Sequence, residues 1–165
     1  MKYYHGSSKR LKIKTILTAT KKSTDFSFEL STIDEAIVEL LRPEKYLSRL
    51  ECLFMADDVD SILELGGSTK YIYEVEPIGQ VDSSNLFWLS TAFSVNDTST
   101  RDECIINYWE GTSVTHDDLL FFTDIDPDDI DPDDTDPEEE DSIESVTERW
   151  EYRTKSFKII KKLRL

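Results

Sequence analysis

One segment of this chain cannot contribute to a hydrophobic core. Residues 124–144 contain 13 Asp and Glu residues and no Lys or Arg, and they repeat a five-residue unit built around Asp-Pro. Like charges repel one another and proline supplies no amide donor, so this segment is predicted to be an extended, disordered loop. The fold must therefore come from the remaining residues.

Most of the net charge of the chain comes from the same segment. The formal net charge is −16, from 35 acidic and 19 basic residues; without the 13 acids of residues 124–144, 22 acids face 19 basic residues, a net charge of −3. Taken over the whole chain, this excess disfavours DNA, RNA and anionic membranes as direct partners, because phosphate binding needs Lys and Arg. It leaves open a basic protein partner, or mimicry of a nucleic acid.

Length and composition predict one cytoplasmic domain. A chain of 165 residues with 38% hydrophobic residues can form a single core, so we expect one domain over residues 1–165, with residues 124–144 inserted within it. Cys52 and Cys104 are far apart and form no CxxC motif, which predicts neither a metal site nor a disulfide framework. The sequence has no membrane-spanning run of about 20 apolar residues. It also opens without a signal-peptide core.

Short strands and helices are expected along the rest of the chain. Alternating or short apolar runs predict strands at Lys2–His5, Cys52–Met55, Lys70–Glu76 and Trp150–Leu165, and a further extended piece around residues 11–17. Pro77-x-Gly79 is expected to end the strand over Lys70–Glu76. Helices are expected after a cap at Ser31 or Thr32, with Glu35 completing a Thr32-x-x-Glu35 capping box, after Asp57 or Asp58, and over Arg101–Glu110, which Gly111 follows. Strands outnumber helices, which predicts an α+β domain.

Four pieces of the sequence resemble a known family in the family's own order. They are Tyr3-Tyr4-His5-Gly6-Ser7, Leu53-Phe54-Met55-Ala56, Tyr71-Ile72-Tyr73-Glu74-Val75-Glu76-Pro77-Ile78-Gly79 and Tyr152-Arg153-Thr154. Together they resemble the rifamycin ADP-ribosyltransferase family. This resemblance implies a small ADP-ribosyltransferase-like fold, with two packed short β-sheets and a few helices. Much of Leu86–Glu148 has no counterpart and is expected to be an insertion.

The resemblance implies NAD as the cofactor and places its site on the first strand. His5 would hydrogen-bond a ribose hydroxyl, Gly6 would let the backbone approach the nicotinamide amide, and Ser7 would add a hydroxyl. The family's stacking Tyr falls on Leu53. The nicotinamide–ribose bond breaks through a sugar cation, so the reaction also needs negative charge beside that cation.

No carboxylate stands at the family's catalytic position, which falls on Ser84. Asp82, two residues away, and Glu151 are therefore the candidate catalytic carboxylates beside His5, and Glu110 is a further one. Each also has a structural interpretation. Asp82 can be a turn residue, Glu151 an outward strand position, and His5 a strand-end histidine without a ligand.

Two functions fit these patterns. The first is an ADP-ribosyltransferase, in the glycosyltransferase class, that transfers ADP-ribose from NAD to an unidentified acceptor such as a basic host protein in a toxin or phage setting. The second is a non-catalytic binding module, or nucleic-acid mimic, that docks its acidic repeat on a basic partner. The substitutions at Leu53 and Ser84 favour the second function, and the retained His5-Gly6-Ser7 favours the first.

Overall fold

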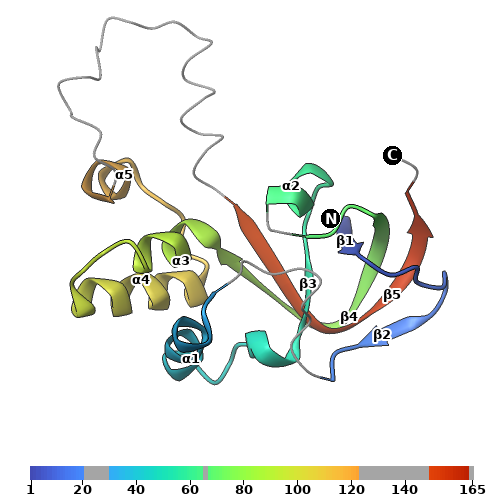
Figure 1. The fold of residues 1–165 in the computed structure, drawn as a ribbon, viewed down its shortest axis with the longest axis horizontal. Coiled ribbons are helices and arrows are strands. Elements are labelled where there is room, and N and C mark those ends of the chain that lie inside the picture. The colour runs from blue at the N-terminus through green and yellow to red at the C-terminus, as the bar shows by residue number, and fades with distance from the viewer. Residues whose placement is uncertain (21–29, 65–66, 123–148, 164–165) are drawn as a thin grey trace, which may run out of the picture. The chain divides into compact units, whose positions relative to one another are not determined.

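The computed structural model describes residues 1–20, 30–64, 67–122 and 149–163. The chain forms two compact units (Figure 1): unit 1 is Met1–Ser84 with Trp150–Leu165, and unit 2 is Asn85–Arg149. The boundaries between the units fall beside the ends of Leu86–Glu148, the segment without a counterpart in the resemblance. The predicted acidic loop, residues 124–144, lies outside the described residues.

Unit 1 is built on an antiparallel sheet. The described part of the chain contributes five strands to it: β1 (Tyr3–Ser7), β2 (Ile16–Thr18), β3 (Leu53–Met55), β4 (Tyr71–Asn85) and β5 (Trp150–Lys162). Their order is β1-β4-β5-β2, and β3 pairs with β5 off this path. β5 is long enough, at 13 residues, to pair with β3 through residues 152–154 and with β2 through residues 156–158. Together with the helices, this sheet confirms the predicted α+β class.

One residue pair joins β3 back to β1. Tyr4 and Ala56 exchange both backbone hydrogen bonds, with N–O distances of 2.8 and 2.9 Å, as an isolated antiparallel bridge. The pairings above already join all five described strands in one hydrogen-bonded sheet, whereas two packed sheets were expected. The long β5 explains the difference, because it pairs along its length with strands that would otherwise form separate sheets.

The hydrophobic core of unit 1 is formed by side chains from three strands of this sheet. Alternation along β4 places Tyr73 and Val75 on the same side of that strand, as the sequence predicted. Strands β3, β4 and β5 together contribute the buried cluster Leu53, Met55, Tyr73, Val75, Tyr152, Phe157 and Ile159. The C-terminal strand is therefore part of the central packing of unit 1.

The described residues of unit 1 also form three short helices: α1 (Thr32–Leu40), the 3₁₀ helix η1 (Arg49–Glu51) and α2 (Asp60–Glu64). The start of α1 is as predicted, because the Ser31 hydroxyl accepts a hydrogen bond from the Asp34 amide at 3.2 Å. Glu35, expected to close a capping box, is instead buried and bonds to Arg49. At α2 the cap is Asp58, which accepts from the Ser61 amide at 2.8 Å.

β4 runs further than the sequence indicated. Pro77-x-Gly79 was expected to end the strand, but β4 continues through these residues to Asn85. Gly79 has a φ of +87°, in the left-handed region that glycine adopts without steric cost. This local departure lets the chain resume the strand, which brings Asp82 and Ser84 into the sheet.

Unit 2 is helical where it is described. It contains α3 (Leu86–Ala92), α4 (Thr98–Glu110) and α5 (His116–Phe122). α4 begins three residues before the predicted start, because Asp97 accepts from the Thr100 amide at 2.7 Å, and it ends as predicted at Gly111, whose φ is +63°. Trp88 and Trp109 are buried and contribute to the core of unit 2.

A first prediction concerns Gly6, which has no room for a side chain. A Cβ at this position would lie 2.7 Å from Ile62 Cγ2 and still closer to the Ser68 carbonyl oxygen, a backbone atom that cannot move aside cheaply. We expect Gly6→Ala to lower the free energy of unfolding by about 3 kcal/mol, measured by urea denaturation.

Gly79→Ala is the matched control for this substitution. Its Cβ would meet nothing within 4 Å, although the φ of +87° is strained for alanine. The expected loss is about 1 kcal/mol. Equal losses for the two variants would contradict the close approach at Gly6.

Candidate functional site

His5 is an internal link between strands. Its side chain is 2% exposed, its Nδ1 lies 3.0 Å from the Phe54 carbonyl oxygen on β3, and its ring centroid is 4.9 Å from that of Phe157. The carbonyl can only accept, so Nδ1 donates. The hydrogen bond lies next to the Tyr4–Ala56 bridge and extends the connection between β1 and β3 by one residue.

The surroundings of Gly6 and Ser7 are also filled by the protein's own chain. The Ser68 carbonyl and the Ile62 side chain occupy the space that a Cβ on Gly6 would need. Ser7 is buried, and its hydroxyl accepts a hydrogen bond from the Lys9 amide at 3.2 Å. The close backbone approach that glycine permits here is therefore made by residues of the segment before β4.

Leu53 and Asp82, two further predicted site residues, are held in structural contacts. Leu53 is 4% exposed and belongs to the hydrophobic cluster of unit 1. Asp82 is 7% exposed, and it accepts hydrogen bonds from the Leu47 amide at 2.5 Å and from Gln80 Nε2 at 2.7 Å. Asp82 thus fixes the loop that leads into η1.

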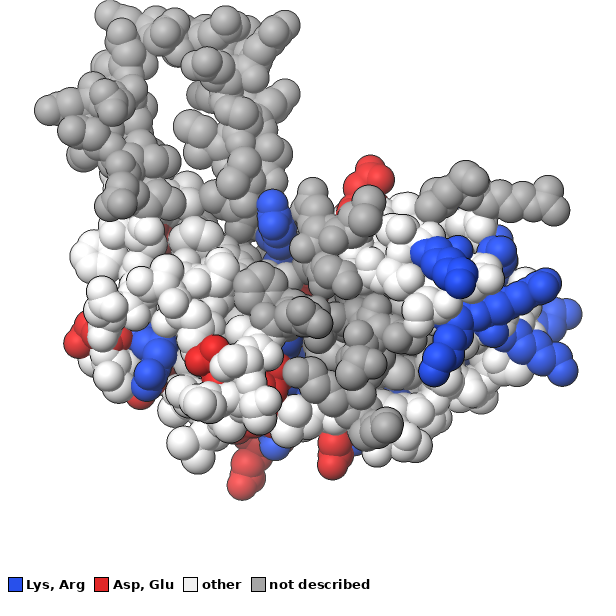
Figure 2. Space-filling model, in the orientation of Figure 1, with Lys and Arg blue, Asp and Glu red and all other residues white. Residues whose placement is uncertain are grey.

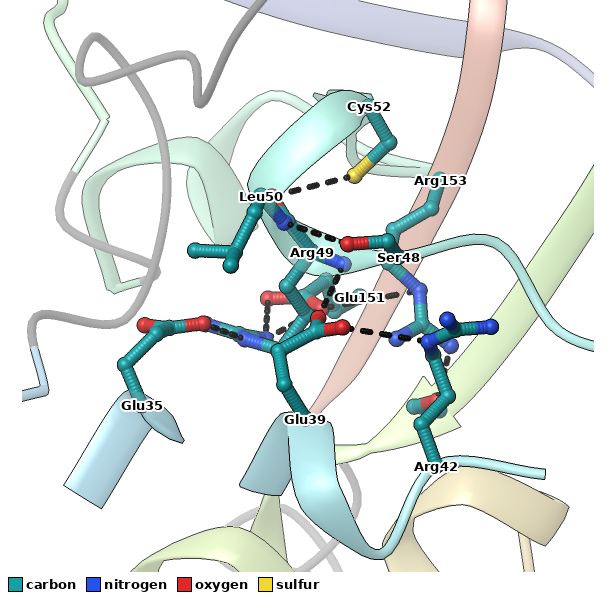
Figure 3. A network of polar contacts seen from close by, with 10 residues as sticks. Glu35, Glu39, Arg42, Ser48, Arg49, Leu50, Cys52, Glu151 and Arg153 are labelled. Carbon is teal, nitrogen blue, oxygen red and sulfur yellow. Dashed lines mark hydrogen bonds and ion pairs between the residues drawn. The ribbon is translucent and has the colours of Figure 1, made fainter. Parts of the chain in front are cut away.

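Glu151 lies in a buried network of arginines and carboxylates (Figure 3). Arg49 donates to both Glu151 oxygens, at 2.7 and 2.9 Å, and its Nε donates to Glu35 at 2.9 Å. All three side chains are at most 5% exposed. A carboxylate removed from water is stable only when it is paired in this way. Glu151 therefore joins β5 to η1 and α1.

Arg153 connects the same network to β4. Its Nη2 donates to the Ser84 hydroxyl at 2.6 Å, and its Nε lies 3.9 Å from Glu151 Oε1. Ser84, the position where the resemblance places a catalytic Asp, thus binds an arginine. Local sequence patterns missed Arg49 and Arg153 as important residues, because Arg49 meets its partner Glu151 102 residues further along the chain.

The predicted site residues are only partly brought together. His5, Gly6 and Ser7 follow one another on β1, and Leu53 lies on β3, whose next residue accepts the His5 hydrogen bond. Asp82 and Glu151 take part in the separate contacts described above. Glu110 is exposed at the end of α4 in unit 2.

A hollow lined by aromatic side chains lies at the start of β1. We call it the aromatic hollow; it measures about 420 Å³ and is lined by Met1, Tyr3, Val81, Ser83, Trp150 and Tyr152. The Tyr3 and Tyr152 rings meet edge to face with centroids 5.1 Å apart. Such a hollow suits a flat, partly polar ring, because aromatic faces give stacking area at low entropic cost.

A carboxylate lies beside this hollow. The Tyr152 hydroxyl donates to Asp57 Oδ2 at 3.0 Å. Burial, together with the nearby Asp57 charge, raises the pKa of Tyr152 and that of Tyr3, so both hydroxyls stay protonated beyond the pH at which an exposed tyrosine titrates. The sequence marked Asp57 only as a possible helix cap. Asp58 takes that role, which leaves Asp57 to pair with Tyr152.

Unit 1 is thus an α+β unit with a buried charge network and an aromatic hollow beside a carboxylate. The family model described as Protein of unknown function (DUF2441) matches residues 2–130, and the chain belongs to this family. The match ends before β5, the strand that carries Glu151 and Tyr152. Among the curated proteins compared, none matches the chain.

The described residues contain neither a membrane-spanning helix nor a metal-binding cluster. None of the helices in these parts of the chain is long and apolar enough to cross a membrane. Within the same residues, no group of three or more His, Cys, Asp or Glu side chains is placed to hold a metal ion.

A second prediction concerns the buried network. Arg49→Met would leave Glu35 and Glu151 buried without their shared guanidinium. We expect a loss of about 3–5 kcal/mol in the free energy of unfolding, measured by urea denaturation. The triple variant Glu35→Gln/Arg49→Met/Glu151→Gln removes the two carboxylate charges that faced Arg49 and should recover part of that loss.

Lys155→Met provides the control for this prediction. Lys155 and Glu51 form an ion pair at 2.8 Å, but their side chains are 46% and 65% exposed. Solvent screens such pairs, so the urea midpoint should hardly move. If Arg49→Met were as mild as Lys155→Met, the network would not hold the unit together.

A third prediction is a loss of stability at alkaline pH. Burial, with Glu151 nearby, raises the pKa of the Cys52 thiol to about 12, whereas an unfolded thiol titrates near 8.5. The folded state therefore keeps a proton that the unfolded state loses. The stabilisation is complete below about pH 8.5 and declines as the pH rises, by up to about 1.4 kcal/mol per pH unit.

Urea denaturation at pH 8, 9 and 10 measures this decline. Cys52→Ala should have a lower free energy of unfolding at pH 8 but a shallower slope, because one of the buried thiols is gone. Cys104, whose pKa is raised to about 11 by burial, contributes the remaining thiol slope. A wild-type stability that stays constant from pH 8 to 10 would refute this account.

Proposed function

We propose that unit 1 binds NAD and transfers its ADP-ribose group to an acceptor, releasing nicotinamide. One observation carries this proposal: the four sequence pieces that resemble the ADP-ribosyltransferase family form β1, β3, β4 and β5 of one sheet. The pieces are separated along the chain by segments of very different length. Their assembly into neighbouring strands supports a shared fold, and with it the small ADP-ribosyltransferase-like architecture.

The aromatic hollow is the proposed position of the nicotinamide. Tyr3 lies two residues before His5 on β1, and Tyr152 begins the β5 piece of the resemblance. Trp150 and Tyr152 supply ring faces in place of the stacking Tyr that Leu53 does not provide. His5, Gly6 and Ser7 then act by fixing β1, through the Phe54 hydrogen bond and the contact with Ser68.

Asp57 is the proposed carboxylate for the transfer. When the bond between nicotinamide and ribose C1′ breaks, its electron pair goes to the ring nitrogen, which gives neutral nicotinamide and a sugar cation. The acceptor's nucleophile then bonds to C1′ and loses its proton. A carboxylate near C1′ stabilises the cation. Asp57 is only partly buried, and its hydrogen bond to Tyr152 places it beside the hollow, whereas Asp82 and Glu151 are buried and bind partners elsewhere in unit 1.

A non-catalytic binding module is the second candidate function. It is favoured because the catalytic residues predicted from the sequence already bind other parts of the chain. His5, Asp82 and Glu151 are all at most 7% exposed, and each binds another part of the chain. In this alternative the sheet is a scaffold, and the acidic repeat binds a basic partner.

A fourth prediction separates the two functions. We expect NAD to raise the melting temperature of the full chain, and nicotinamide to be released from NAD when cell lysate supplies acceptors. Trp150→Ala should abolish the shift by removing a stacking face. Asp57→Asn should keep the shift but slow nicotinamide release about 100-fold, because the neutral amide cannot stabilise the cation. Thermal denaturation measures the shift in melting temperature, and chromatography measures the nicotinamide that is released.

Glu76→Gln is the control, because Glu76 is an exposed carboxylate on β4. It should behave as the wild type in both assays. A shift with NAD but no nicotinamide release with any lysate would support the binding module. The absence of both effects at millimolar NAD would overturn the NAD proposal itself.

A further inference from the structure

The basic residues of this acidic chain are concentrated at its two ends. Residues 1–20 contain five Lys or Arg residues and no Asp or Glu, and residues 152–163 contain five more, again without an acid. The whole-chain charge conceals this pattern, because residues 124–144 alone carry 13 acids. The local charge of these two segments is therefore opposite in sign to the net charge of the whole chain.

The sheet brings these two basic segments side by side. β2 pairs with β5 in the register Ile16–Lys158, and the Lys14 amide donates to the Ile159 carbonyl at 2.8 Å. Figure 2 shows Lys and Arg side chains gathered over this part of unit 1. We call the set the basic surface; its members are Lys9, Arg10, Lys12, Lys14, Lys158 and Lys162.

The cations of the basic surface are available to a ligand. All six are exposed, and none of them forms an ion pair with another described residue. Their neighbours on β5 differ, because Lys155 pairs with Glu51 and Lys161 with Glu74, each at 2.8 Å. The structure thus neutralises some lysines of β5 and leaves the basic surface uncompensated within the described residues.

Part of the basic surface is concave. A hollow of about 450 Å³ is lined by Arg10, Leu11, Lys12, Ile13 and Lys162, so three cations share its wall. A compact anionic group such as a phosphate can enter this hollow and meet all three. The guanidinium of Arg10 adds the planar donor geometry that matches phosphate oxygens.

The loop that carries these cations is held in place by the core. The Leu11 amide donates to the Tyr73 hydroxyl at 2.9 Å, and the Leu11 side chain packs against the hydrophobic cluster. Lys14 has a φ of +66°, a left-handed conformation that a non-glycine residue keeps only when its surroundings impose it. A loop ordered before binding loses less entropy when a ligand arrives.

An aromatic side chain adjoins the basic surface. Lys162 Nζ lies 4.7 Å from the centre of the Tyr71 ring, and Lys70 Nζ lies 5.8 Å from it. Tyr71 is half-buried at the start of β4. Cations interleaved with an aromatic ring are the combination by which proteins hold single-stranded nucleic acids, through phosphates and base stacking.

We propose that the basic surface of unit 1 binds the phosphate backbone of a single-stranded nucleic acid. Screening limits the reach of exposed charges to about 8 Å at physiological salt, so the nearby lysines outweigh the average charge of the chain. The Tyr71 ring beside these cations favours a single strand over an anionic membrane, because a strand offers bases as well as phosphates. The binding proposed here does not depend on the NAD proposal.

The fifth prediction tests this surface by salt-dependent binding. A fluorescent 20-nucleotide single strand, RNA or DNA, should bind the full chain in anisotropy titrations between 50 and 200 mM salt without NAD. Contacts to about four phosphates would give a slope near −3 in a plot of log affinity against log salt. Arg10→Gln/Lys12→Gln should weaken binding at least about 10-fold and reduce the slope by about 1.4, because two phosphate contacts are lost.

Lys2→Gln/Lys45→Gln is the matched control, since it removes two exposed cations of unit 1 outside the basic surface. It should change the affinity less than about 2-fold. Equal weakening by the two double variants, no binding by the wild type at 50 mM salt, or binding to phosphatidylserine vesicles but not to the strand would each overturn the proposal. Because no assay step contains NAD, failure here is distinct from failure of the transferase proposal.

Discussion

Unit 1 depends most on the ion pairs that the buried guanidinium of Arg49 forms. This guanidinium binds Glu35 of α1 and Glu151 of β5, and it lies 5.2 Å from the Phe54 ring of β3. These elements are far apart in sequence. Burying the Glu35 and Glu151 carboxylates without the Arg49 cation would lower the stability of the folded state. The ion pair between Arg49 and Glu151 therefore fixes the position at which β5 joins the sheet. β5 in turn pairs with β2 and β3, so the order of the sheet depends on this contact.

Local signals account for what the sequence could predict about the fold. The Ser31 cap, the Gly111 stop and the alternation of β4 involve residues within a few positions of each other, and the structure has all three. The extension of β4 beyond Pro77 was not predictable in this way. It depends on Gly79 adopting a positive φ and on partners provided by other strands. The same holds for Glu35, which has a capping position in the sequence but binds Arg49 instead.

For the candidate site too, the residue types could be read from the sequence, whereas their surroundings could not. A His-Gly-Ser segment indicates a ligand or a close contact within the chain, and the two cannot be told apart without knowing what lies opposite. In unit 1 the space beside Gly6 belongs to Ser68, and the His5 hydrogen bond goes to Phe54. Asp57 was missed because its neighbour Asp58 fits the same helix-cap position. Two adjacent aspartates precede α2, and only the structure shows which one caps the helix and which one meets Tyr152.

The two surfaces proposed for binding share one core. Tyr73 accepts the hydrogen bond that holds Leu11 under the basic surface, and it packs in the same cluster as Tyr152 of the aromatic hollow. A change in that cluster would reach both surfaces, whereas a change of Arg10 or of Asp57 would reach only one. Both surfaces lie within unit 1, and a strand held on one would be presented by the same sheet that forms the other.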